Sequence, residues 1–176
     1  PQAAYQRLRA PADTQAAMLR ALELDEATHT AMAARCAARG IEFLSTPFDP
    51  PSLALLLDLG VRRLKVASGE LTNWPMLLRM ARTGLPVLVS TGMATLDEVA
   101  DALGVLAWGR GHADGTPDRA ALAAARASVE ASGPGALPGV TVLHCTSSYP
   151  AAPADVNLRA MDALGTAFGL PVGYSD

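Results

Sequence analysis

Lys65 is the only lysine in this chain of 176 residues, since the other thirteen cationic side chains are all arginine. It stands at the end of a short apolar run, just before the pair Ser68-Gly69. An ammonium is a compact point charge that suits a phosphate or a carboxylate, unlike the planar fork of a guanidinium. An ordinary surface lysine explains this single residue equally well, so the rest of the chain must decide between the two interpretations.

Small polar residues follow five short apolar runs, in the clusters Ser45-Thr46, Lys65 with Ser68-Gly69, Ser90-Thr91-Gly92, Thr146-Ser147-Ser148-Tyr149 and Tyr174-Ser175. Hydroxyls, backbone N–H groups beside glycine and one ammonium together suit a small oxyanion. Serine and threonine also cap helices, so each cluster taken alone is better explained as structural. The sequence has no Gly-x-x-x-x-Gly-Lys motif, which argues against a nucleoside triphosphate and for a phosphorylated or carboxylated metabolite.

The apolar runs are residues 41–44, 63–67, 86–89, 140–144 and 170–173. Each is short and rich in Val, Leu or Ile without alternation, which is typical of strands buried on both faces. Helical patterns occupy 14–39 with a break near 24–25, then 52–59, 73–82, 95–103, 117–131 and 158–168. Asp49-Pro50 and the capping box from Thr95 to Glu98 are the clearest start signals.

Strands that alternate with helices predict parallel βαβ units, and the spacing is typical of a TIM (β/α)8 barrel. Such a barrel needs eight strands and about 250 residues, so we expect an incomplete barrel with about five of the eight strands. Residues 104–139 are interpreted as an insert on the surface. A doubly wound sheet remains possible, although no Gly-x-Gly-x-x-Gly fingerprint follows the first predicted strand.

The net charge is −3, and the sequence contains no basic cluster of the kind that nucleic acid or an anionic membrane would require. No apolar run has the length of a membrane span. Cys36 and Cys145 form no motif, which indicates a reducing compartment, and we expect a cytoplasmic protein. The chain starts at Pro1 and ends at Asp176, and we expect both ends to be cut.

Six motifs occur in a fixed order along the chain: Phe-Leu-Ser-Thr-Pro-Phe-Asp, Lys-Val-Ala-Ser-Gly-Glu, Val-Ser-Thr-Gly-Met-Ala-Thr-Leu-Asp-Glu, His-Cys-Thr-Ser-Ser-Tyr-Pro, Asp-Val-Asn-Leu-Arg-Ala-Met and Val-Gly-Tyr-Ser-Asp. Together they closely resemble the N-acetylneuraminate (sialic acid) synthase family, which includes the legionaminic and pseudaminic acid synthases. The resemblance covers nearly all of the chain except residues 104–139. No single motif is specific, but the ordered set is.

The resemblance implies a TIM barrel followed by a small C-terminal antifreeze-like domain that is absent here, so residues 1–176 are a partial synthase domain. The implied reaction condenses phosphoenolpyruvate with an N-acetylated aminosugar such as N-acetylmannosamine. It gives a nine-carbon 2-keto acid, and phosphate leaves by C–O cleavage. The family also implies a divalent metal, usually manganese, and a homodimer when the protein is intact.

Matched to the family's motifs, Lys65 and Ser68 resemble phosphoenolpyruvate ligands, and Tyr149 resembles a tyrosine near the reacting centre. Further contacts match Thr46, Ser90, Ser147 and Ser175, although some members have asparagine in place of Ser147. The metal-binding histidines and a catalytic glutamate would lie outside this chain, so we expect no metal ligand within it and no catalysis by the fragment alone.

Two other interpretations of the chain stay open. Strand-end lysines also serve as Schiff-base nucleophiles in barrel aldolases, which would make Lys65 a covalent catalyst. A non-catalytic pseudoenzyme or binding fragment would carry the same motifs without turnover. We interpret His144 as a core residue or one that supports a ligand residue, and Cys145 as a packed thiol.

Overall fold

The computed structural model describes residues 14–133, 137–146 and 151–175. The chain divides into two compact units, and the described residues up to Phe43 belong to the first. Those from Leu44 onwards belong to the second, which carries most of the predicted motifs.

The described residues of the first unit form two helices, α2 (Gln15–Leu22) and α3 (Glu26–Ala38). Each begins at a side-chain cap: the Thr14 hydroxyl accepts a hydrogen bond from the N–H of Ala17, and the Asp25 carboxylate accepts one from the N–H of Thr28. These caps satisfy N–H groups that have no partner within the helix. The predicted helical stretch and its break are therefore confirmed.

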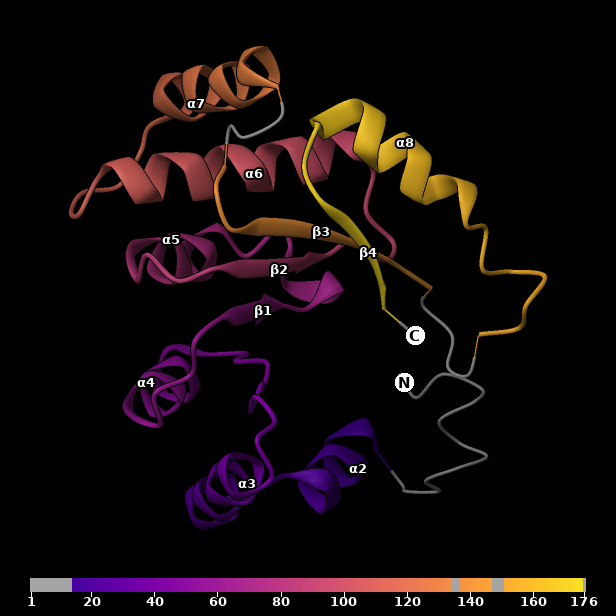
Figure 1. Ribbon diagram of the computed structural model, residues 1–176. Helices are drawn as coiled ribbons and strands as arrows, with labels where there is room; N and C mark the ends of the chain where they lie inside the picture. Colours follow the sequence, from indigo (N-terminus) through magenta and orange to yellow (C-terminus); the bar gives the residue numbers. More distant parts are fainter. Residues whose placement is uncertain (1–13, 134–136, 147–150, 176) are drawn as a thin grey trace. The chain divides into compact units, whose positions relative to one another are not determined.

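The second unit is built on a parallel four-stranded sheet in the order β1-β2-β3-β4 (Figure 1). The strands are β1 (Leu64–Val66), β2 (Val87–Ser90), β3 (Val140–Cys145) and β4 (Val172–Ser175). The α/β class and four of the five predicted strands are thereby confirmed.

The prediction of a first strand at residues 41–44 was wrong, since the backbone from 41 to 47 forms no strand. A short apolar run becomes a strand only where a neighbour completes its ladder of hydrogen bonds. None of the four strands pairs with this run, the side chain of Ile41 is 61% exposed, and the two units divide between Phe43 and Leu44.

The helices of the second unit are α4 (Pro50–Asp58), the short 3-10 helix η1 (Ser68–Glu70), α5 (Trp74–Arg82), α6 (Leu96–Gly111), α7 (Arg119–Ser132) and α8 (Arg159–Phe168). Helices α4 and α6 begin at the predicted start signals, Asp49-Pro50 and Thr95. The capping box is present, because Thr95 N–H donates to Glu98 Oε2 at 2.7 Å and Glu98 N–H donates to Thr95 Oγ1 at 3.2 Å. Helices α5 and α8, for example, end just before glycines with positive φ, Gly84 and Gly169, because that backbone conformation suits a residue without Cβ.

The predicted end of the fourth helix was wrong. It was placed near Leu103, but α6 continues to Gly111, and Leu103, Val105 and Leu106 are completely or almost completely buried. The first part of the supposed surface insert is therefore part of the core. The end of the helix was mispredicted because α6 is apolar around most of its circumference and so lacks a clear amphipathic pattern. This composition is typical of a helix that is covered on more than one side.

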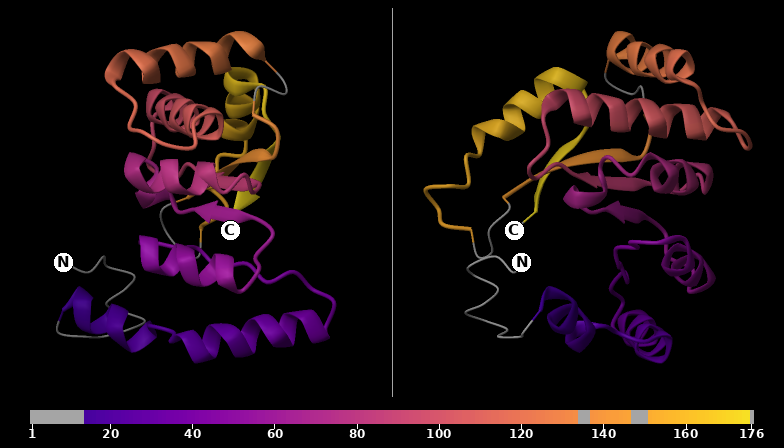
Figure 2. Two further views of the ribbon diagram at one scale, coloured as in Figure 1. Left: turned by 90° about the vertical axis from the view of Figure 1, so that its left-hand side faces the viewer. Right: turned by 180° about the vertical axis from the view of Figure 1, so that it is seen from behind.

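Helix α6 lies between two other helices, with α5 on one side and α7 on the outside (Figure 2). Glycines allow both close approaches. A Cβ on Gly109 would stand 2.7 Å from Cβ of Ala81 on α5, and a Cβ on Gly104 would stand 3.1 Å from the backbone of Arg126 on α7. The second layer formed by α7 thus depends on a helix surface with no side chain in the way.

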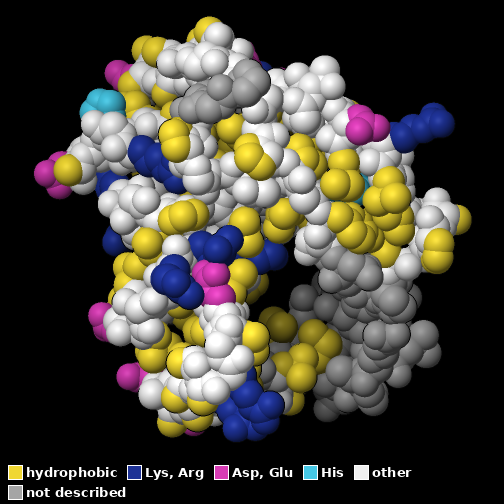
Figure 3. All heavy atoms as spheres, in the orientation of Figure 1, with side chains coloured by type: hydrophobic (Ala, Val, Ile, Leu, Met, Phe, Trp, Pro, Cys, Tyr) yellow, Lys and Arg dark blue, Asp and Glu magenta, His cyan; other side chains and the backbone are white. Residues whose placement is uncertain are grey.

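Charged side chains are dispersed on the face drawn in Figure 3. Lys and Arg lie among Asp, Glu and hydrophobic side chains there, and the described part of this face carries no continuous basic band. In the part of the chain that the structure describes, no helix combines the length and the apolar character needed to cross a membrane.

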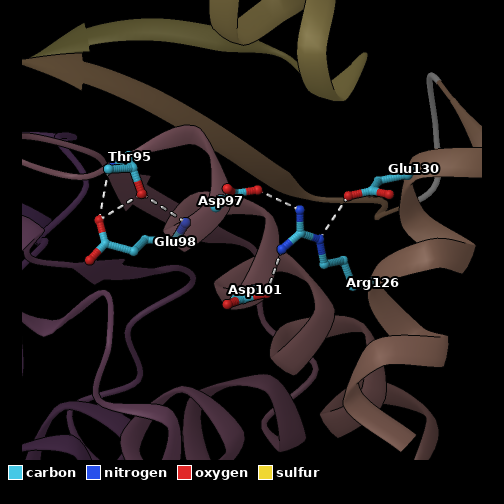
Figure 4. A network of polar contacts seen from close by, with 6 residues as sticks. All are labelled: Thr95, Asp97, Glu98, Asp101, Arg126 and Glu130. Carbon is cyan, nitrogen blue, oxygen red and sulfur yellow. Dashed lines mark hydrogen bonds and ion pairs between the residues drawn. The ribbon is translucent and has the colours of Figure 1, made fainter. Parts of the chain in front are cut away.

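Arg126 on α7 binds three carboxylates, two of which belong to α6 and therefore connect the two helices (Figure 4). Its guanidinium donates to Asp97 at 2.7 Å and to Asp101 at 2.8 Å, both on α6, and to Glu130 at 2.8 Å on its own helix. Hydrogen bonds from the guanidinium to these carboxylates raise the pKa of Arg126 further above its ordinary value. The network fixes the lateral position of α7 on α6.

Candidate functional site

Four side chains that could bind or react with a ligand share one face of the parallel sheet: Lys65 on β1, Ser90 on β2, Cys145 on β3 and Ser175 on β4. The register places them there, since Lys65 pairs with Leu88, two residues before Ser90. Cys145 stands two residues after the partner of Ser90 and pairs directly with Ser175. In a parallel barrel the carboxyl ends of the strands form the active-site face, and three of these four residues lie at such ends.

The opposite face of the sheet is the apolar core, and its central side chains are at most 1% exposed: Leu64, Val66, Val87, Val89, Val140 and Val142. Helix α8 packs on this face, because a Cβ on Gly165 would come within 3.7 Å of Val172 Cγ2. On the face away from this core, Lys65 and Ser175 are half buried, whereas Ser90 and Cys145 are buried. The sheet thus separates a packed face from one that a ligand can approach.

Three strand ends meet in a triangle of polar atoms. Ser68 Oγ and Cys145 Sγ are 3.1 Å apart, and the N–H of Gly92 donates to both, at 3.0 Å to the oxygen and 3.1 Å to the sulfur. A Cβ on Gly92 would stand 3.0 Å from Ser68 Oγ and 3.1 Å from Cys145 Sγ, so a larger residue would crowd both atoms. The predicted ligand Ser68 is therefore held in place by Gly92, just after β2, and by Cys145 on β3.

Ser90 differs from the other candidates because it is almost completely buried, with 2% of its surface exposed. Its hydroxyl has no hydrogen-bond partner among the described residues. A buried polar group without a partner is rare and often marks the position of a ligand or a water molecule. In this structure the hydroxyl is also closed to solvent, so a ligand would reach it only after a neighbouring group moves.

A small hollow of about 140 Å³ opens beside Ser68, lined by Ser68, Leu71, Thr72, Gly92, Met93, Ala94 and Glu98. Met93 is one of two described non-glycine residues with positive φ, at 65°, and its side chain is 77% exposed. The left-handed conformation is costly for a residue with a side chain, and such strain clusters at functional sites. The turn after β2 therefore presents both the Gly92 amide and an exposed thioether next to the triangle.

A larger hollow of about 580 Å³ lies near the amino ends of β2 and β3, between Arg82, Arg110 and Pro138. Both guanidiniums there already donate to backbone carbonyls, Arg82 to His112 and Gly115, and Arg110 to Leu85 and Pro138. Burial lowers the pKa of Arg110. These arginines support the loops at the edge opposite the candidate site.

The remaining predicted site residues fall into two groups. Thr46 is half buried and lies in the segment before α4 that forms no strand. Ser147 and Tyr149 lie outside the described residues. The structure therefore brings together Lys65, Ser68, Ser90 and Ser175 on one face or edge of the sheet.

Sequence reasoning missed the part played by Cys145 and Gly92. Cys145 is buried, as predicted, but it also contacts a candidate ligand residue. The sequence indicates only that Cys145 shares a strand face with Leu143; the pairing of Leu143 with Ser90, which brings Cys145 to the candidate site, comes from the structure. His144 lies on the other face, where its Nε2 is 2.6 Å from the backbone carbonyl of Val156, as expected of a residue that is not a ligand.

The described residues contain no group of three or more His, Cys, Asp or Glu side chains that could hold a metal ion. This part of the chain therefore does not supply a complete metal site.

Comparison with known proteins gives a consistent result. The NeuB family matches residues 1–176. An N,N'-diacetyllegionaminic acid synthase of Legionella pneumophila is 42% identical over 99% of this chain and 43% of its own length. An N-acetylneuraminate-9-phosphate synthase of Drosophila melanogaster is 28% identical over 88% of this chain and 35% of its own length. The chain thus spans less than half the length of these curated relatives.

Among solved structures, an N-acetylneuraminic acid synthetase from Leptospira borgpetersenii in complex with citrate matches with a TM-score of 0.72 and 28% identity. The match covers 93% of this chain and 49% of that one. The predicted fold class, an incomplete TIM barrel, is thereby confirmed. This chain belongs to the NeuB family of sialic acid synthases.

Proposed function

We propose that the protein containing this chain condenses phosphoenolpyruvate with an N-acetylated aminosugar to give a nine-carbon 2-keto acid and phosphate. The observation that carries the proposal is the shared position of Lys65, Ser68, Ser90 and Ser175 on one face or edge of a parallel sheet. Family membership supplies the reaction class, since relatives of this chain are named synthases of sialic acids.

Lys65 and Ser68 would bind the anionic groups of phosphoenolpyruvate. An ammonium forms short, charge-assisted hydrogen bonds with phosphate and carboxylate oxygens, and the hydroxyl, held by the Gly92 N–H, adds a neutral donor. Ser90 and Ser175 would complete the site from β2 and β4. Thr46, Ser147 and Tyr149 remain proposed contacts, with Tyr149 near the reacting centre.

The reaction balances as one condensation followed by the loss of phosphate. Carbon 3 of phosphoenolpyruvate forms a bond to the aldehyde carbon of the sugar, and the aldehyde oxygen takes up a proton. Water adds at carbon 2, and the bond from carbon 2 to the phosphate oxygen breaks. Phosphate leaves and the ketone remains. The residues on the sheet would hold the enol phosphate still while the new bond forms.

The acceptor is proposed to carry two N-acetyl groups. Two relatives, from Legionella pneumophila and Campylobacter jejuni, are named N,N'-diacetyllegionaminic acid synthases and are 42% and 39% identical to this chain. Those named N-acetylneuraminate-9-phosphate synthases are 28% or 29% identical. We also propose a homodimer and a divalent metal, manganese, whose ligands lie outside the described residues.

The test measures phosphate release from phosphoenolpyruvate by a protein of the relatives' full length, with manganese in the buffer and either a diacetamido sugar or N-acetylmannosamine as acceptor. Lys65→Ala should abolish the release, and Lys65→Arg should not restore it, because a guanidinium has a different shape and reach. Near-normal turnover by Lys65→Ala would refute the assigned role.

The same protein separates this proposal from the aldolase alternative. Borohydride reduction in the presence of pyruvate would attach pyruvate to Lys65 if the lysine formed a Schiff base. The condensation proposed above predicts that mass spectrometry finds Lys65 unmodified.

A further inference from the structure

We infer that Cys145 is a positioning residue: its thiol, together with the Gly92 N–H, orients the Ser68 hydroxyl toward the anion that the candidate site binds. The inference rests on the proposed function, because the anion is taken to be phosphoenolpyruvate. It assigns to the cysteine a role that its burial alone would not suggest.

The three atoms form a closed arrangement with distances of 3.0 Å and 3.1 Å. The N–H of Gly92 can only donate, and it fills one acceptor position of Ser68 Oγ. A hydroxyl oxygen has two acceptor positions and one proton. When the thiol of Cys145 donates to the second position, both lone pairs of Ser68 are occupied and its single proton is left for a ligand.

The direction of that proton matters because an anion needs donors. Without the thiol, the hydroxyl of Ser68 can rotate and donate to another acceptor, and the Gly92 amide loses the sulfur as its second acceptor. The thiol would thus act on the substrate through Ser68 and Gly92 rather than by touching it. Cys145 is suited to this role because it is only 7% exposed and pairs with Ser175 in the sheet.

An independent observation also indicates a ligand on this face of the sheet. Ser90 is 2% exposed, its hydroxyl has no partner among the described residues, and it belongs to the same face as Cys145. An orphan hydroxyl on the same sheet face as a cysteine that orients the Ser68 hydroxyl is what a site prepared for an anion would contain.

The experiment compares Cys145→Ala and Cys145→Ser with Cys36→Ala in the full-length protein. Cys36 lies on α3 in the first unit and is the matched control. Loss of one neutral hydrogen bond should raise the KM for phosphoenolpyruvate about fivefold in Cys145→Ala, with kcat changed less than about twofold. Cys145→Ser keeps a donor and should recover most of the lost affinity, while Cys36→Ala should behave as the wild type.

Coupling to Ser68 separates positioning from simple packing. In a Ser68→Ala background, Cys145→Ala should raise the KM no further, because residues that act as a unit are not additive. An unchanged KM in Cys145→Ala, or equal and independent effects in the two backgrounds, would overturn the inference. If Cys145→Ala does not fold, Cys145→Val, which fills the space without a donor, takes its place in the same comparison.

Amide hydrogen exchange gives a readout that does not need turnover. The Gly92 N–H should exchange faster in Cys145→Ala than in the wild type and Cys145→Ser, as measured by mass spectrometry on a peptide that includes Gly92. Equal exchange rates would contradict the positioning role. A wild-type protein that releases no phosphate would refute the proposed function instead. The hydrogen-exchange rates of Gly92 would then be the only test of the positioning role.

Discussion

Helix α6 contains three glycines in three different environments, and replacing each by alanine tests how tightly the helix is packed. A Cβ on Gly109 would stand 2.7 Å from Cβ of Ala81 and 3.4 Å from Leu78 Cδ2. A Cβ on Gly104 would stand 3.1 Å from three atoms of Arg126. A Cβ on Gly111, the last residue of the helix, would meet nothing within 4 Å.

Two opposing terms set the magnitude. Alanine is favoured over glycine inside a helix by about 1 kcal/mol, and the gain is smaller at the last turn. Overpacking costs about 1–3 kcal/mol, and Cβ of Ala81 cannot rotate away because it is fixed to the backbone of α5. Carbon atoms prefer a separation of about 3.5–4.0 Å, so α5 and α6 would have to separate by roughly 1 Å in Gly109→Ala.

We therefore expect Gly111→Ala to be neutral or slightly stabilising and Gly109→Ala to be less stable than Gly111→Ala by about 1–3 kcal/mol. Gly104→Ala should fall between them, because α7 can yield by the few tenths of an ångström that its 3.1 Å contacts require. The assay is urea unfolding followed by circular dichroism, with the free energy of unfolding compared at equal slope. Equal stability of Gly109→Ala and Gly111→Ala would refute the close contact between α5 and α6.

Two further predictions concern charge. Arg126→Met should lower the free energy of unfolding only slightly, by about 0–1 kcal/mol, because the partners Asp97, Asp101 and Glu130 are 44–85% exposed. In 1 M NaCl the difference from the wild type should shrink, and a large effect that does not depend on salt would contradict a surface ion-pair network. Hydrogen bonds from Thr95 hold the pKa of Glu98 below its ordinary value. A carboxyl group whose pKa is lowered in the folded state stabilises the fold at pH values above its ordinary pKa. This stabilisation is lost as the pH falls through the pKa of the folded state. The melting temperatures of the wild type and Glu98→Gln should therefore differ at pH 7 and converge near pH 2.

The helices of this chain were predictable because their signals are local. Asp49, Asn73 and Thr95 each accept a hydrogen bond from a backbone N–H three residues later, so the cap can be read from a few neighbouring letters. The end of α6 was not predictable in this way. Its continuation past Leu103 is stabilised by contacts with the neighbouring helices α5 and α7, such as those of Gly109 with Ala81 and of Gly104 with Arg126, so tertiary packing decides the end of the helix there.

The candidate site was predictable in part. Strand ends of a parallel sheet must meet at one edge, and this alone brought Ser68, Ser90 and Ser175 into consideration. The contact between Ser68 and Cys145 depends on the register of three strands, because the two residues are 77 positions apart in the sequence. Register follows from side-chain packing across the whole sheet, so motifs on one strand do not reveal it.

The packing of α6 and the geometry of the site are mechanically connected. Gly92, which completes the triangle with Ser68 and Cys145, lies only three residues before the cap Thr95, where α6 begins. The position of α6 is set in turn by its glycine contacts with α5 and α7 and by Arg126. A shift of α6 along its axis would move the turn that carries the Gly92 amide, and distances of 3.0–3.1 Å leave little room before these hydrogen bonds weaken. The helix layers therefore also determine the position of the Gly92 N–H, which in turn holds Ser68 in the candidate anion site.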